Sequence, residues 1–182
     1  LEYINLLGRK TADALFIDGT DKSDINFAID FINDGGTDVI YIPKGTADNE
    51  ESLETLLFAA SNTGTEVKYI SAPCFTGFEN NFNMYCVFPN ENMIDGITCE
   101  NAVFKFVSGD YVFWYLGDAD ETELKYLMYA GCDILSNAVY AQSLESDSIK
   151  DFITESKAKY IITQSNEDID FDVIDTENYG KV

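Results

Sequence analysis

Histidine is missing from all 182 residues of this chain. Its absence excludes the Ser-His and Cys-His nucleophile systems, and it removes the usual general base near neutral pH and the commonest zinc ligand. Basic residues are scarce as well, since 11 lysines and arginines stand against 33 aspartates and glutamates, giving a net charge of −22. Such a charge repels phosphate backbones, so we expect no nucleic-acid binding by this domain alone.

Long apolar runs are also missing. None approaches the roughly 20 residues that a membrane helix needs, so we expect no membrane insertion by this segment. The sequence contains no basic stretch followed by an apolar stretch, which is the pattern of a signal peptide. The chain begins at Leu1 instead of methionine, which we interpret as processing or trimming of a longer precursor. Composition leaves the compartment, the oligomeric state and the protein partner open.

The cysteines lack the spacing of a metal or redox motif, because none forms a CxxC pair. Each lies in or beside an apolar run, so we expect buried free thiols, with one disulfide as the alternative outside the cytosol. The four are Cys74, Cys86, Cys99 and Cys132.

What the chain does contain is apolar material in regular patterns. Hydrophobic residues make up 46% and aromatics 14%, enough for a globular core. Helical spacing predicts helices over 23–34, from 50, from 120 and over 146–157. Ser23 or Asp24 is expected to cap the first, and Asp120 with Glu123 forms a capping-box pattern in the third. Strands are predicted over 2–7, 12–19, 37–43, 66–71, 83–89, 101–107, 111–117, 133–140, 159–164 and 170–175.

Strands and helices therefore alternate, with a hairpin turn at Ser108-Gly109-Asp110. The segment 73–81 is predicted to be a loop. In the aromatic run of 111–115, Trp114 and Tyr115 point to opposite faces, so at least one side packs in the core. An exposed aromatic on the other side could anchor a partner, but we expect a helix to shield it. No linker or repeat interrupts the pattern, so we predict one α/β domain over 1–182. The hairpin in the centre favours two sheets in a four-layer αβ/βα sandwich over a plain doubly wound fold.

Three stretches resemble the metallo-β-lactamase fold, and in particular the domain of ComEC-type DNA-uptake competence proteins. The first stretch consists of ALFIDG, a helix and then DVIYIPKGTADNEESLETL. ENAVFKFVSGDYVFWYLGDADETELKYLM follows and ends its hairpin in Leu-Gly-Asp, the most specific piece. AGCDILSNAVYAQS is the third, and KYIITQSN is similar to the closing strand. The resemblance covers nearly the whole chain in consistent order.

The resemblance implies a metal site whose ligands have been replaced. Laid on the family pattern, two of the positions keep an aspartate, Asp48 and the metal-bridging Asp118. The other positions, which hold histidines in the family, carry non-histidine residues here. The vestigial site positions are Lys44, Thr46, Asp48, Asn49, Asp118, Val139 and Tyr140.

These replacements oppose the family chemistry. Lys44 places an ammonium where a cation should bind, and Val139 has no donor atom. We therefore predict a degenerate, non-catalytic domain with no cofactor and no catalytic residue. It would serve as a structural or interaction module of a ComEC-like protein of the cell envelope or the extracellular space.

Two alternatives stay open. One is a divergent metal-dependent hydrolase or phosphodiesterase with Asp48 and Asp118 as carboxylate ligands. The other is a binder of a small anionic ligand in the former cleft, with Lys44 meeting the anion. Three acidic clusters allow weak calcium or magnesium binding, although none matches the calcium-loop pattern. These clusters are Asp18, Asp21 and Asp24; Asp118, Asp120 and Glu121; and Asp168, Asp170 and Asp172.

Overall fold

The computed structural model describes residues 6, 8–44, 50–78, 81–88, 101–164 and 173–175. Their contacts divide the chain into two compact units. The first comprises residues 1–72 and 89–102, and the second comprises residues 73–88 and 103–182. Each unit has a sheet and a pair of helices, and the single domain predicted over 1–182 stays a prediction. None of the helices in the described ranges is long and apolar enough to cross a bilayer.

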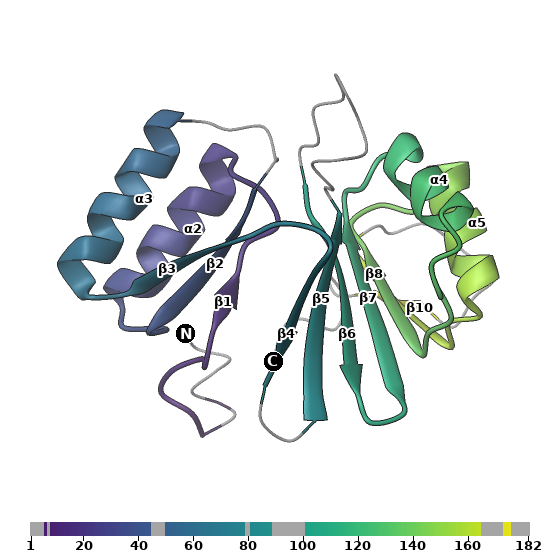
Figure 1. Cartoon of the computed structure of the whole chain (residues 1–182), viewed down its shortest axis with the longest axis horizontal. Coiled ribbons are helices and arrows are strands. Elements are labelled where there is room, and N and C mark those ends of the chain that lie inside the picture. Colours follow the sequence, from purple (N-terminus) through teal and green to yellow (C-terminus); the bar gives the residue numbers. More distant parts are fainter. Residues whose placement is uncertain are drawn as a thin grey trace. The chain divides into compact units, whose positions relative to one another are not determined.

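The first unit contains a three-stranded parallel sheet in the order β1-β2-β3 (Figure 1). Parallel neighbours need a crossover connection, and α2 and α3 supply the two crossovers. The two helices pack against each other. In chain order the elements are β1 (Leu15–Phe16), α2 (Lys22–Asn33), β2 (Val39–Pro43), α3 (Glu50–Thr63) and β3 (Glu66–Ile70).

The core of this unit lies between the helices and one face of β2. The helical spacing predicted for α2 is confirmed, and Leu56 of α3 is completely buried. Leu57 is 37% exposed because the next residue on a helix points about 100° away. The core residues are Ile17, Ile25, Ala28, Ile32, Ile40, Ile42, Leu56, Ala59 and Ala60.

The N-cap of helix α2 lies before both residues that were predicted to cap it. Asp21 is the N-cap, and its carboxylate accepts hydrogen bonds from the backbone N–H groups of Ser23 and Asp24 at 2.7 and 2.9 Å. The expected caps Ser23 and Asp24 are therefore donors in the first turn. An aspartate binds two otherwise unpaired amides and its charge suits the helix N-terminus, which explains the choice.

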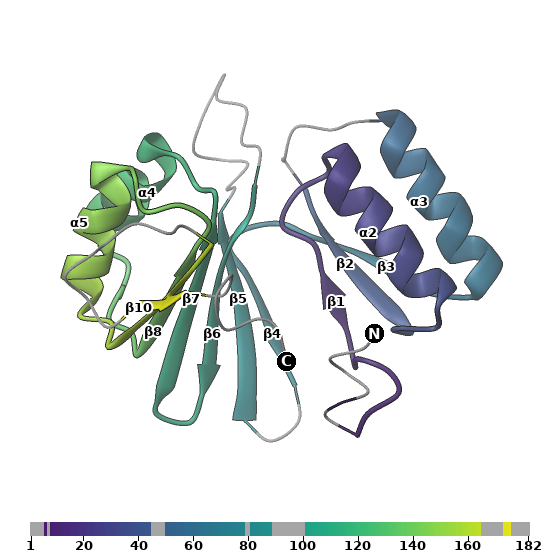
Figure 2. The ribbon, with the colours of Figure 1, turned by 180° about the vertical axis from the view of Figure 1, so that it is seen from behind.

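The second unit is built on a seven-stranded sheet in the order β10-β9-β8-β7-β6-β5-β4. Strands β4 to β7 pair antiparallel, and β7 to β10 pair parallel. Helices α4 and α5 lie side by side in both views (Figures 1 and 2). The elements are β4 (Cys74–Gly77), β5 (Phe82–Phe88), β6 (Val103–Ser108), β7 (Tyr111–Gly117), α4 (Glu121–Tyr129), β8 (Ala138–Ala141), α5 (Asp147–Ser156), β9 (Tyr160–Thr163) and β10 (Val173–Asp175).

Strand β7 confirms the predicted division of its aromatic residues. Trp114 is 1% exposed, and its ring meets Phe152 of α5 edge-on at 5.5 Å. Tyr115 points to the opposite face and stacks on Tyr140 of β8 at 4.9 Å. One face of the sheet is therefore sealed by α5, as expected for the tryptophan.

Two local predictions for this unit have different outcomes. The capping box at α4 is confirmed: the N–H of Glu123 donates to Asp120 Oδ1, and the N–H of Asp120 donates to Glu123 Oε2, both at 2.9 Å. The loop predicted over 73–81 is wrong, because residues 74–77 form the edge strand β4. The strand predicted over 2–7 and the cysteine at position 99 lie outside the described residues, except for Leu6.

Candidate functional site

Lys44 stands at the carboxyl end of β2. Its backbone N–H donates to the carbonyl oxygen of Ile70 at 2.7 Å, which ties the end of β2 to β3. Its side chain is exposed. Thr46, Asp48 and Asn49 lie outside the described residues, so their part of the predicted site, and the anion site that would use Lys44, stay predictions.

Asp118 follows β7 at the carboxyl edge of the parallel half of the second sheet. Gly117 makes the turn possible with φ of +60°, and its carbonyl accepts a hydrogen bond from the N–H of Gln142 at 2.7 Å. The carboxyl edge of parallel strands is where open α/β sheets bind ligands. Asp118 itself is exposed, and its role as a metal-bridging residue stays a prediction.

The other two carboxylates of the acidic cluster around Asp118 have structural roles. Asp120 caps α4, and Glu121 forms an ion pair with Lys125 one turn along that helix. Asp21 of the first cluster caps α2 in the same way. Among the residues that the structure describes, no three histidine, cysteine, aspartate or glutamate side chains are grouped closely enough to hold a metal ion. The third cluster, 168–172, lies outside those residues.

Val139 and Tyr140 lie inside β8, and they point to opposite faces of the sheet. Val139 is opposite Trp114 of β7 and is completely buried on the helix-covered face. Tyr140 stacks on Tyr115 on the other face. Successive strand residues alternate between faces, so the pair does not converge on one point as two metal ligands must. Both side chains pack instead.

These placements test whether the described positions fit the metal that the fold family implies. Val139 offers no donor, Tyr140 is held in a ring stack, and Lys44 is a cation. That leaves Asp118 as the only ordinary metal ligand among the predicted positions that the structure describes. A dinuclear centre needs several imidazoles and carboxylates around each ion, so these described residues do not fit one.

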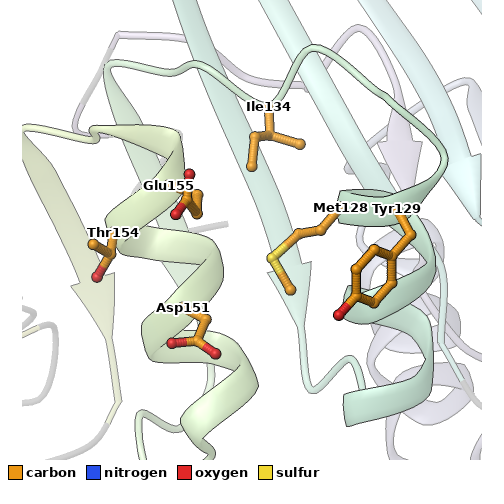
Figure 3. Close-up of a pocket in the computed structure, with 6 residues that line it drawn as sticks. All are labelled: Met128, Tyr129, Ile134, Asp151, Thr154 and Glu155. Atoms are coloured by element: carbon orange, nitrogen blue, oxygen red, sulfur yellow. The ribbon is translucent and has the colours of Figure 1, made fainter.

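A second candidate site is a groove of about 440 Å³ between α4 and α5, entirely within the second unit (Figure 3). Met128 and Ile134 are half-buried and give it an apolar lining, whereas the ring of Tyr129 is 84% exposed. The side chain of Met128 extends from α4 toward α5. The lining residues are Met128, Tyr129, Ile134, Asp151, Thr154 and Glu155.

The α5 side of the groove is acidic. Asp151 and Glu155 are exposed and one helical turn apart, a spacing at which like charges oppose helix formation by about 0.2–0.5 kcal/mol. Within the described ranges, neither has an ion-pair partner within 4 Å. Lys125 on α4 is bound to Glu121, which chiefly raises the pKa of its ammonium, and Asp151 adds a smaller rise. The groove thus combines an apolar lining with two carboxylates that form no ion pair within 4 Å in the described ranges.

No protein-family model matches the sequence, and no curated protein matches it. Among solved structures, the fold is similar to CmlA, a diiron beta-hydroxylase from Streptomyces venezuelae, with a TM-score of 0.54 and 8% identity over 85% of this chain and 35% of that one. The E377D mutant of CmlA beta-hydroxylase gives a TM-score of 0.55 and 9% identity over 85% of this chain and 36% of that one.

CmlA has a metallo-β-lactamase fold, so the chain is an α/β protein with a metallo-β-lactamase-like fold, as predicted. The chain spans about a third of the length of these structures. They contradict the prediction of no cofactor, because the matched protein is a diiron enzyme and metal use therefore accompanies this fold. The prediction was wrong because it inferred the absence of any cofactor in the whole chain from replaced histidines at five positions.

Proposed function

We propose that this chain is a non-catalytic metallo-β-lactamase-like domain that works as an interaction module, within a ComEC-like protein of the cell envelope. The observation that carries the proposal is the packing of two side chains at positions where the resemblance implies metal ligands. Val139 is completely buried in the sheet and Tyr140 stacks on Tyr115. A scaffold that keeps its fold while these positions pack as core retains its surfaces for binding.

The groove between α4 and α5 is the binding surface that we assign to this module. Its occupant would be a polypeptide segment that presents a lysine or arginine beside an apolar side chain. The basic group would meet Asp151 and Glu155, and the apolar group would contact Met128 and Ile134. Methionine adapts to varied apolar shapes, and an exposed tyrosine such as Tyr129 supplies contact area at little entropic cost.

The test uses a fluorescently labelled helical peptide with lysines one turn apart beside a leucine face. We expect the double variant Asp151→Lys/Glu155→Lys to bind this peptide at least tenfold more weakly than the unaltered chain. The reason is that two attractive charges become repulsive at the rim of the groove. Fluorescence anisotropy at about 0.15 M salt, where distant charges are screened, gives the affinities.

The matched control is Glu51→Lys/Glu54→Lys on α3. It makes the same change in net charge with two exposed helical carboxylates of the first unit. If this control weakens binding as much as the groove variant, the peptide responds to overall charge and the groove is not its site. Loss of affinity in Met128→Ala as well would support seating of the leucine face.

A second candidate function is a divergent metal-dependent hydrolase or phosphodiesterase that uses Asp48 and Asp118. The diiron identity of the matched structure favours it. Carboxylate oxygens are the donors that magnesium, manganese and calcium prefer, so these two residues suit hard cations better than zinc. Asp118 follows β7, which pairs in parallel with β8, and its exposed carboxylate is accessible to a cation from solution.

Elemental analysis of the purified chain and hydrolysis of bis(p-nitrophenyl) phosphate with added magnesium, manganese or calcium separate the two candidates. For the interaction module we expect no turnover above background with any of the three ions. Turnover that disappears in Asp118→Ala and persists in Asp110→Ala would establish the hydrolase instead. Asp110 is a suitable control because it is an exposed carboxylate of the β6–β7 turn in the same unit.

A further inference from the structure

Two cysteines face each other across neighbouring strands of the second unit. Cys74 opens the edge strand β4, and the antiparallel register places it directly opposite Cys86 of β5. Directly opposed residues of an antiparallel pair have side chains on the same face of the sheet. Both are recorded as free thiols.

The register also fixes the spacing of the pair. The N–H of Phe78 donates to the carbonyl oxygen of Phe82 at 2.7 Å, which marks those two residues as a hydrogen-bonded pair. Such pairs recur every second residue, so Cys74 and Cys86 fall on the same phase, where Cα atoms are about 5.5 Å apart. Disulfides span Cα separations of about 4.4–6.8 Å, most often near 5.5–6 Å. The backbone therefore needs little movement to accept a bond.

The surroundings of the two thiols differ. Cys86 is 1% exposed, and its thiol lies 3.5 Å from the carbonyl oxygen of Phe88, to which it donates. Burial chiefly, with a smaller electrostatic contribution from Cys74, raises the pKa of Cys86 to about 12. Cys74 is half-buried on β4, which pairs with β5 and with no other strand of the described ranges. An oxidant in solution therefore reaches Cys74 before Cys86. The electrostatic contribution of Cys74 to the pKa of Cys86 shows that the two sulfurs lie close together.

We propose that Cys74 and Cys86 are a redox modification site, at which a dissolved disulfide such as oxidised glutathione forms a cross-strand disulfide. The Cys74 thiolate attacks one glutathione sulfur, forming a mixed disulfide and releasing one glutathione thiolate. Cys86 loses its proton to water and attacks the Cys74 sulfur, which releases the second glutathione thiolate. The two protein thiols lose two electrons and two protons, and one oxidised glutathione becomes two reduced glutathiones.

The bond would fasten a strand that is otherwise weakly held. Strand β4 has four residues, and in the part of the chain that the structure describes it pairs only with β5. It begins two residues after Ala72, where the chain passes from the first unit to the second. Short edge strands open easily, so a covalent link at position 74 would fix the start of the second unit in an oxidising compartment.

The test exposes the native full chain to oxidised glutathione and maps its disulfides by protease digestion and mass spectrometry. We expect the mass to fall by two hydrogens, the count of titratable thiols under denaturing conditions to fall from four to two, and one peptide pair to link Cys74 to Cys86. Hydrogen exchange of the β4 amides should slow in the oxidised form.

Two variants keep the result interpretable. Cys99→Ser/Cys132→Ser retains only the proposed pair and should lose both remaining thiols, whereas Cys74→Ser should keep Cys86 reduced under the same oxidant. Circular dichroism of each variant before oxidation checks that it folds. A bond through Cys99 or Cys132 in the unaltered chain would overturn the proposal. So would a glutathione adduct on Cys74 that Cys86 does not displace.

Discussion

Replacing Trp114 with alanine lowers the free energy of unfolding of the second unit by about 3–5 kcal/mol. The indole is 1% exposed between β7 and α5, so truncation leaves a large cavity beside Phe152. It also removes an edge-on ring contact worth about 0.5–1.5 kcal/mol and the cation–π contact of Lys105, whose ammonium lies 5.3 Å from the ring centre. Urea unfolding followed by circular dichroism measures the loss.

Two further variants separate cavity formation from other causes. Trp114→Phe keeps most of the ring and should cost much less, since it also removes an indole N–H that is buried without a hydrogen-bond partner among the described residues. Tyr111→Ala removes an aromatic ring from the same strand that is 71% exposed, and should change stability by less than about 0.5 kcal/mol. Equal losses in the Trp114→Ala and Tyr111→Ala variants would show that Trp114 is not a core residue.

Replacing Leu56 with alanine should lower the free energy of unfolding by about 2–5 kcal/mol, through a cavity in the core of the first unit. Leu56 is completely buried between α3 and the rest of that core. Phe58→Ala on the same helix is the control, because its ring is 69% exposed. An equally large loss for Phe58→Ala would contradict the assignment of the buried face of α3.

The Leu56→Ala variant also tests whether residues 1–182 form one cooperative domain. Trp114 is the only tryptophan of the chain and lies in the second unit, so its fluorescence reports that unit alone. If the chain is a single domain, Leu56→Ala should shift the unfolding midpoint measured by fluorescence as far as the unfolding midpoint measured by circular dichroism. A fluorescence midpoint that stays in place would mean that the units unfold independently.

The sequence predicts the elements of this fold well where an apolar pattern and a cap coincide. The helix from 120 combines the capping box of Asp120 and Glu123 with buried Leu124 and Leu127, and it lies where it was expected. Strand β4 was missed because its outward residue is Phe75, which is 59% exposed, so apolar and polar residues do not alternate there. Only pairing with β5 defines that strand.

The candidate sites were less predictable than the fold. Motif alignment treated Val139 and Tyr140 as a pair, although the alternation of a strand already separates their side chains. The groove between the helices had no motif at all, because Met128 and Glu155 are distant in sequence and meet only when α4 packs beside α5. The single sequence signal was the like-charged pair Asp151 and Glu155 on one helix face.

The two end strands that the described residues give the seven-stranded sheet bear on how copies of this protein behave toward one another. Strands β4 and β10 form those ends, with four and three residues. Unpaired edge backbone can template aggregation, and an edge this brief presents few amides to a neighbouring chain. A net charge of −22 adds mutual repulsion. The short edge strands and the negative charge that all copies share together oppose polymerisation through strand pairing.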